Sequence, residues 1–175
     1  MDDRGARFEA LVAEVHEPLD RYLRRRANSH DADDVMSEVL LTLWRRLDAI
    51  PQPTPLPWCY GVARKALANH PRADRRRLHL VQRLEAQPPR GSGDEEDHPE
   101  LATALASLSP ADREVVILWA WEELEPREIA VVLETTPNAV SLRLSRARKK
   151  LAAELARQNA GGAGHIQDGT TGAHE

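Results

Sequence analysis

The chain has 175 residues and a formal net charge of −4, a length that allows one ordinary domain or two small ones. Cys59 is the only cysteine, which excludes an internal disulfide and a cysteine-based zinc cluster. The sequence has no apolar run of membrane-spanning length and no signal-peptide core near its first residue, so we expect a cytoplasmic protein without membrane insertion.

Apolar residues recur at helical spacing through the first half of the chain, where strand-like alternation is absent. One helix is expected over residues 6–26, and a second is expected to begin at a cap formed by Asp31. Four prolines within residues 50–57 predict an extended loop. A third helix is expected to begin near Trp58, and Pro71 should end or kink it at the residue before.

A change of composition divides the chain. Residues 85–99 contain prolines, glycines and the acidic run Asp94–Asp97, which predicts a flexible acidic linker between domains 1–84 and 100–157. In the second domain Ser109 should cap a helix with Pro110 at its first position. The glycine-rich residues 158–175 cannot bury a core, so we expect a disordered tail. The predicted fold is all-α, with two small helical domains.

Residues 126–155 predict a helix-turn-helix. A short helix from Pro126 is followed by a turn at 134–137 and a longer basic helix from Asn138. Glu134 stands in the turn where glycine is common. The expected buried stripe of the second helix leaves the opposite surface free to reach base edges and phosphates. An amphipathic hairpin with solvated arginines would show the same local pattern.

Two basic segments, residues 64–83 and 127–157, lie on either side of the linker. The net charge of the whole chain conceals both of them. Two separate faces that attract phosphate predict a protein that holds nucleic acid at two places, which favours the helix-turn-helix over the solvated hairpin.

Motifs in both halves resemble one family, the extracytoplasmic-function RNA polymerase sigma factors. In the second half the resemblance lies in residues 108–116, 128–130 and 139–148, which look like the family's promoter-binding C-terminal domain. In the first half residues 31–39 look like its polymerase-docking helix, and Trp58, residues 62–64, Asn69 and residues 75–77 resemble its promoter-melting segment. The similarity extends from about Phe8 to Leu155, in the family's order. Cys59, Lys65 and Pro71 depart from its pattern.

The resemblance implies three surfaces. Contact with core RNA polymerase is expected from the outward residues of the second helix: Asp33, Asp34, Ser37, Glu38, Leu41 and Arg45. The downstream promoter element, as it melts, is expected to meet Tyr60, Arg64, Lys65, Asn69, Arg72, Arg75, Arg76 and Arg77. The upstream element is expected to meet Arg127, Thr136, Asn138, Ser141, Leu142, Arg143, Ser145, Arg146, Arg148 and Lys149.

Some of these assignments have simpler alternatives. Asp31 and Asp34 at the start of a helix would also stabilise its dipole without contacting any partner. Trp58 begins an apolar stripe, so we expect it in the core, while Tyr60 is the aromatic residue expected to stack on a base.

The resemblance thus implies an alternative sigma factor that binds core RNA polymerase and promoter DNA and is itself no enzyme. Family members are often held by an anti-sigma factor, which is a further implied partner. No cofactor is expected, and the scattered histidines indicate no metal site. The alternatives are a helix-turn-helix regulator that acts without polymerase and an adaptor whose basic helices bind acidic proteins.

Overall fold

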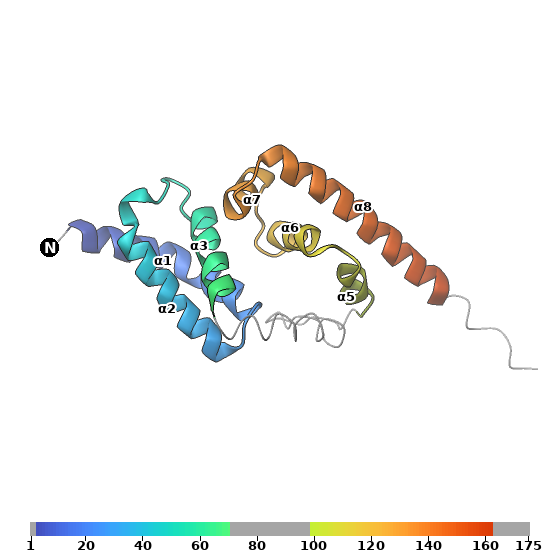
Figure 1. Ribbon diagram of the computed structural model, residues 1–175, viewed down its shortest axis with the longest axis horizontal. Helices are drawn as coiled ribbons and strands as arrows, with labels where there is room; N and C mark the ends of the chain where they lie inside the picture. Colours follow the sequence, from blue (N-terminus) through green and yellow to red (C-terminus); the bar gives the residue numbers. More distant parts are fainter. Residues whose placement is uncertain (1–2, 71–98, 163–175) are drawn as a thin grey trace, which may run out of the picture.

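A computed structural model describes residues 3–70 and 99–162 (Figure 1). In these two ranges the chain forms seven α-helices and one short 3-10 helix, with no strand, which confirms the all-α prediction. The elements are α1 (Asp3–Arg24), α2 (Ser29–Arg45), η1 (Leu47–Ala49), α3 (Leu56–Asn69), α5 (Pro99–Ala106), α6 (Pro110–Ala120), α7 (Pro126–Leu133) and α8 (Pro137–Gly162).

Helices α1, α2 and α3 pack together as the N-terminal domain. Fully buried residues recur every four positions, with Val15 and Leu19 in α1 and Val35, Val39 and Leu43 in α2. This spacing places each set on one face of its helix, so the two stripes meet in the core.

The cap of α2 differs from the prediction. Asn28, rather than Asp31, is the cap, and its side-chain oxygen accepts a hydrogen bond from the backbone N–H of Asp31 at 2.8 Å. Asn28 has the extended backbone that a cap position requires, so the helix begins at Ser29. Asp31 lies inside the first turn and is buried.

The C-terminal domain contains α5 to α8, and its local signals behave as predicted. The Ser109 hydroxyl caps α6 by accepting from the N–H of Asp112 at 3.2 Å, with Pro110 at the first position. Glu134 has a positive φ of 53°, the left-handed conformation that favours glycine, and it ends α7. The Thr136 hydroxyl accepts from the N–H of Ala139 at 3.2 Å at the start of α8. These caps fix the helix-turn-helix of α7 and α8.

Helix α8 continues further than expected. It runs to Gly162, so the predicted disordered tail does not begin at residue 158. Residues 152–158 are mostly Ala, Glu, Arg and Gln, which favour a helix even without a core to cover. Glu154 also pairs along this helix with Arg157 at 2.7 Å and with Gln158 at 3.3 Å.

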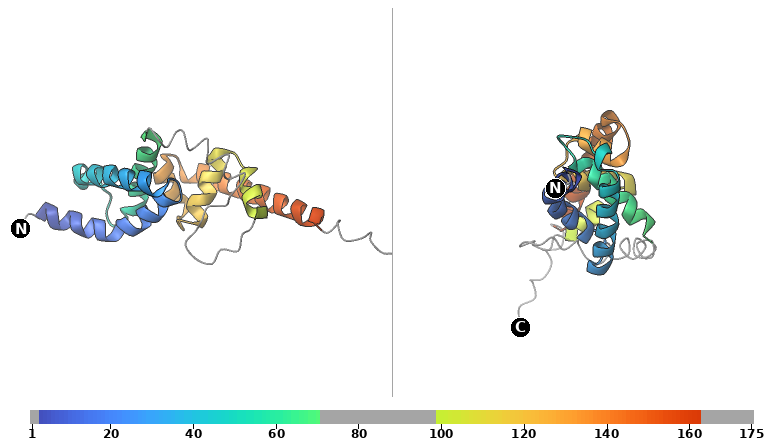
Figure 2. Two further views of the ribbon diagram at one scale, coloured as in Figure 1. Left: turned by 90° about the horizontal axis from the view of Figure 1, so that it is seen from below. Right: turned by 90° about the vertical axis from the view of Figure 1, so that its left-hand side faces the viewer.

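The two domains pack against each other through α3 and α7 (Figures 1 and 2). One continuous hydrophobic cluster includes Tyr60 from α3 and Val132 from α7. At Gly61 the two helices are in close contact, since a Cβ built there would lie 3.6 Å from the Val132 carbonyl oxygen, an ordinary van der Waals distance. The composition of the predicted linker does not reveal that an apolar face of α3 is covered by α7. Residues 85–98 of the expected linker lie outside the described residues.

Candidate binding surfaces

The exposed face of α8 forms the first candidate surface. Val140, Leu144 and Ala147 are buried against the rest of the domain and orient the helix. All ten residues expected to meet the upstream element are exposed. They lie on α7, the turn and α8, so the helix-turn-helix brings them together. Leu142 is 48% exposed among polar side chains, where it provides an apolar contact of the kind that suits a thymine methyl group.

Two basic residues of α8 make contacts within the domain. The guanidinium of Arg148 lies 5.0 Å from the centre of the Trp119 ring on α6, a cation–π contact. The Lys150 ammonium donates to the Ser107 carbonyl. Arg143 and Arg146 are exposed on the same helix. We therefore expect Arg148 to have a positioning role in addition to any phosphate contact.

The second candidate surface lies on α3 and is only partly described. Lys65 and Asn69 are exposed and Arg64 is half-buried. The remaining predicted residues of this set, Arg72, Arg75, Arg76 and Arg77, lie outside the described residues.

Tyr60 does not fit the role that the sequence suggested. Its side chain is only 2% exposed, and its ring centre lies 5.0 Å from that of Tyr22. A base cannot stack on Tyr60 in this arrangement. The spacing of Tyr60 to the buried residues Ala63 and Leu67, three and seven positions on, places it on the inward face of the helix. Trp58 is half-buried and packs against the core, close to its expected position.

The third candidate surface is the outward face of α2. All six predicted polymerase contacts are exposed, and Leu41 is 48% exposed. Asp33 forms an ion pair with Arg24 of α1 at 2.9 Å. Trp44, which the sequence did not suggest, is also exposed; its ring meets that of Phe8 edge to face at 5.1 Å. Trp44 follows Leu41 by three positions, so helical spacing could have added it to this face.

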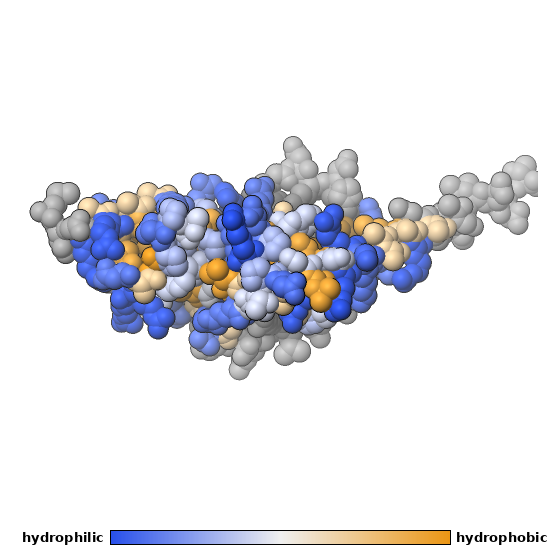
Figure 3. Space-filling model, turned by 90° about the horizontal axis from the view of Figure 1, so that it is seen from above, coloured by the Kyte–Doolittle hydropathy of each residue, from blue (hydrophilic) through white to orange (hydrophobic). Residues whose placement is uncertain are grey.

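On the face that Figure 3 shows, hydrophobic residues lie as separate spots among hydrophilic ones and form no large continuous patch. In the described ranges the large apolar residues that are exposed are Leu41, Trp44, Leu101, Trp119, Val131 and Leu142. This face is therefore mostly polar, with single apolar residues as contact points.

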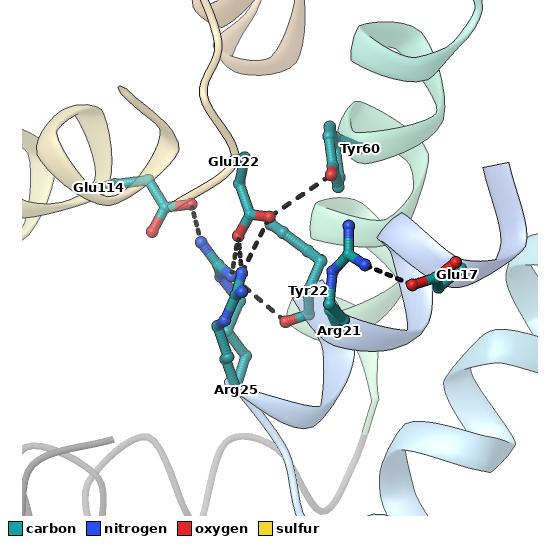
Figure 4. Close-up of polar contacts among 8 residues, drawn as sticks. Glu17, Arg21, Tyr22, Arg25, Tyr60, Glu114 and Glu122 are labelled. Carbon is teal, nitrogen blue, oxygen red and sulfur yellow. Dashed lines mark hydrogen bonds and ion pairs between the residues drawn. The ribbon is translucent and has the colours of Figure 1, made fainter. Parts of the chain in front are cut away.

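A buried ionic cluster joins the two domains (Figure 4). The Glu122 side chain, between α6 and α7, is 2% exposed and accepts from Arg25 at 3.0 Å and Arg26 at 3.2 Å. Its second oxygen lies 3.4 Å from the Tyr60 hydroxyl, and Glu114 lies 3.5 Å from Arg26. Burial, and then the charge of Glu122, raises the pKa of Tyr60 well above its usual range, so Tyr60 is a neutral donor. The sequence contains no local signal for this cluster.

Cys59 is fully buried, as expected of a structural thiol. Burial, with a smaller effect of Glu14, raises the pKa of this thiol to about 12, so it is protonated at neutral pH and is a poor nucleophile. Within residues 3–70 and 99–162 no group of three or more His, Cys, Asp or Glu side chains is arranged to hold a metal ion. None of the helices in these ranges is long and apolar enough to cross a membrane.

Comparisons with known proteins agree with this arrangement. Residues 11–77 match the family model for sigma-70 region 2, and residues 98–151 match the model for sigma-70 region 4. CnrH, solved in complex with the cytosolic domain of CnrY, is similar at 27% identity and a TM-score of 0.57, over 86% of this chain and 88% of CnrH.

A second solved structure shows the same fold. It is the sigma factor RpoE in complex with the anti-sigma factor NepR from Bartonella quintana, at 22% identity and a TM-score of 0.57, over 85% of this chain and 96% of that one. A comparison with curated proteins found no match.

Proposed function

We propose that the two halves of this chain have separate roles in starting transcription. The chain belongs to the sigma-70 family and is an alternative sigma factor of the extracytoplasmic-function group. Such a factor binds core RNA polymerase and directs initiation of transcription at specific promoters.

The helix-turn-helix of α7 and α8 recognises the upstream promoter element. The observation that carries this assignment is the orientation of α8, whose buried stripe leaves Ser141, Leu142, Ser145 and Arg146 on one exposed face. Side chains near the start of such a helix reach base edges in the major groove, while basic residues further along contact phosphates.

The C-terminal part of α3 contacts the downstream element as the duplex opens. Arg64, Lys65 and Asn69 lie on the last two turns of this helix, and the basic residues that follow in the sequence extend the same charge. Their cations hold strand phosphates while bases unstack, a step that costs a few kcal/mol per base.

The outward face of α2 binds core polymerase, with Leu41 as its apolar centre and Glu38 one turn before it. Because polymerase works in the cytoplasm, the factor acts there, and it contributes binding and DNA opening without a catalytic step of its own. The solved relatives in complex with CnrY and NepR support an inhibitor protein as a further partner.

A double variant tests the docking assignment. Replacing Glu38 with Lys and Leu41 with Ala reverses a charge and removes an apolar contact on an exposed face, so helicity should stay unchanged. Capture of the variant by immobilised core polymerase and transcription from a promoter library should both fall strongly. Glu9→Lys, an exposed reversal on α1, is the matched control and should behave like the parent.

Equal capture of the double variant and the parent would remove α2 as the docking helix. Tight duplex binding by the free chain, together with no requirement for polymerase, would instead favour a stand-alone regulator.

A further inference from the structure

We propose that Glu122 closes an intramolecular latch, which holds the two domains together in the free chain and withdraws part of the downstream DNA surface until it opens. The inference rests on the proposed function only in naming Arg64, Lys65 and Asn69 as that surface. The contacts that hold the two domains together are all made by described residues.

Three donors of the N-terminal domain converge on one acceptor of the C-terminal domain. Arg25 and Arg26 lie just beyond α1 and Tyr60 lies in α3, whereas Glu122 lies in the connection between α6 and α7. Glu114 in α6 adds a second carboxylate beside Arg26, so two cations face two anions. The charges balance and the Glu122 side chain is buried, so the cluster forms a joint between the two domains.

A second contact closes the other edge of the interface. The Lys65 ammonium of α3 lies 2.5 Å from the Glu134 carboxylate, in the turn between α7 and α8. Both side chains are more than half exposed, so this pair adds little to stability. The pair is important because it engages Lys65, which is a candidate phosphate contact.

The energetics of the joint allow it to open. Burying charged groups costs desolvation free energy that their mutual attraction largely offsets, so the intact cluster contributes little net stability, whereas removal of one partner leaves the others buried without compensation. The Nη2 atom of Arg26 lies 3.5 Å from Glu114 but makes no hydrogen bond, so this pair is looser than the contacts to Glu122. A partner that binds the open form better therefore shifts the equilibrium toward it. Opening frees Lys65 together with Arg25 and Arg26.

Zero-length crosslinking detects the closed state, in which the two domains are in contact. A carbodiimide joins an amine to a carboxylate only when the two are in contact, so Lys65 and Glu134 should couple in the free parent chain. Glu122→Gln keeps the shape of the side chain but removes its charge, and most of this crosslink should be lost. The radius of gyration from small-angle X-ray scattering should rise in the same variant.

Two further variants separate opening from misfolding. Glu123→Gln makes the same change at the neighbouring exposed residue, which also has a positive φ of 56°, and it should keep the crosslink. Arg25→Gln removes the joint from the N-terminal side and should lose the crosslink as Glu122→Gln does. Circular dichroism should show parental helicity in all three.

Binding of the free chain to a random-sequence DNA duplex tests the withdrawn surface. Glu122→Gln should bind more tightly than the parent and lose affinity more steeply with salt, because more cations meet phosphates. Parental crosslinking and radius of gyration in Glu122→Gln would overturn the latch. Loss of the crosslink with unchanged duplex binding would overturn the withdrawal of DNA contacts. Neither measurement uses polymerase, so failure of the docking test leaves the latch standing, and the reverse also holds.

Discussion

Arg146 offers the sharpest test of how α8 reads the upstream element. It is exposed on the face opposite the buried stripe of Val140, Leu144 and Ala147. Replacing it with Ala removes the guanidinium but leaves the packing of the helix intact. Surface changes of this kind alter the free energy of unfolding by about 0.5 kcal/mol or less. Any larger effect on promoter binding therefore reports the DNA contact.

The size of the loss distinguishes two kinds of contact. A bidentate contact to a guanine is worth about 1–3 kcal/mol of discrimination, which corresponds to a roughly 5- to 150-fold loss of affinity. That loss should disappear on a promoter whose contacted base pair is already changed. A phosphate contact would instead weaken binding about equally on every sequence and lower the salt dependence.

Arg148 supplies the matched comparison on the same helix. Its guanidinium stacks on Trp119, so Arg148→Ala should cost about 0.5–1 kcal/mol of cation–π interaction in a denaturation experiment. Its effect on binding should not depend on sequence. The assay is titration of each holoenzyme onto a set of single-base variants of the upstream element. If Arg146→Ala binds all of them as the parent does, the recognition face of α8 is wrongly assigned.

Two further predictions concern stability and pH. Ser109→Ala should lower the free energy of unfolding in urea by about 1 kcal/mol, because the N–H of Asp112 loses its cap, whereas Ser145→Ala on the exposed face of α8 should change it little; equal effects would contradict the cap. The Lys65 hydrogen bond, and then its charge, lowers the pKa of Glu134 below the usual 4.5, so this pair contributes above that pH and is lost as the pH falls through the lowered value; carboxyl NMR titration should show the shift, and Lys65→Gln should abolish it.

Local structure followed from the sequence because its causes are local. The positions of the helices could be predicted from signals that act within one or two turns. These signals are the spacing of apolar residues, the Ser109 cap and the prolines at 110, 126 and 137. The cap of α2 was misplaced because Asn28 and Asp31 are both good caps, and only the backbone conformation distinguishes them. The extension of α8 was missed because a glycine-rich composition outweighed the helix-forming residues before it.

Contacts between the domains could not be predicted in the same way. Glu122 reads in the sequence as one of several acidic residues after α6, and nothing nearby indicates that its side chain is buried. Its partners lie more than sixty positions away in the chain, and their approach depends on how α7 covers α3. Tyr60 was assigned to DNA for a different reason, since its helical spacing to Ala63 and Leu67, which places it on the inward face, was not applied.

The interface also sets acid against part of the first basic segment, because Lys65 pairs across it with Glu134. Glu114, Glu122 and Glu134 all lie on the C-terminal domain, and each pairs with a cation of the N-terminal domain. A carboxylate and a DNA phosphate compete for the same cation, so acidic residues placed there weaken DNA binding by the free chain without removing the basic residues. Opening the interface then restores the attraction where polymerase presents the promoter. Under the proposed latch, the cluster at Glu122 holds the domains together, and the closed arrangement keeps Lys65 beside Glu134 and away from phosphate.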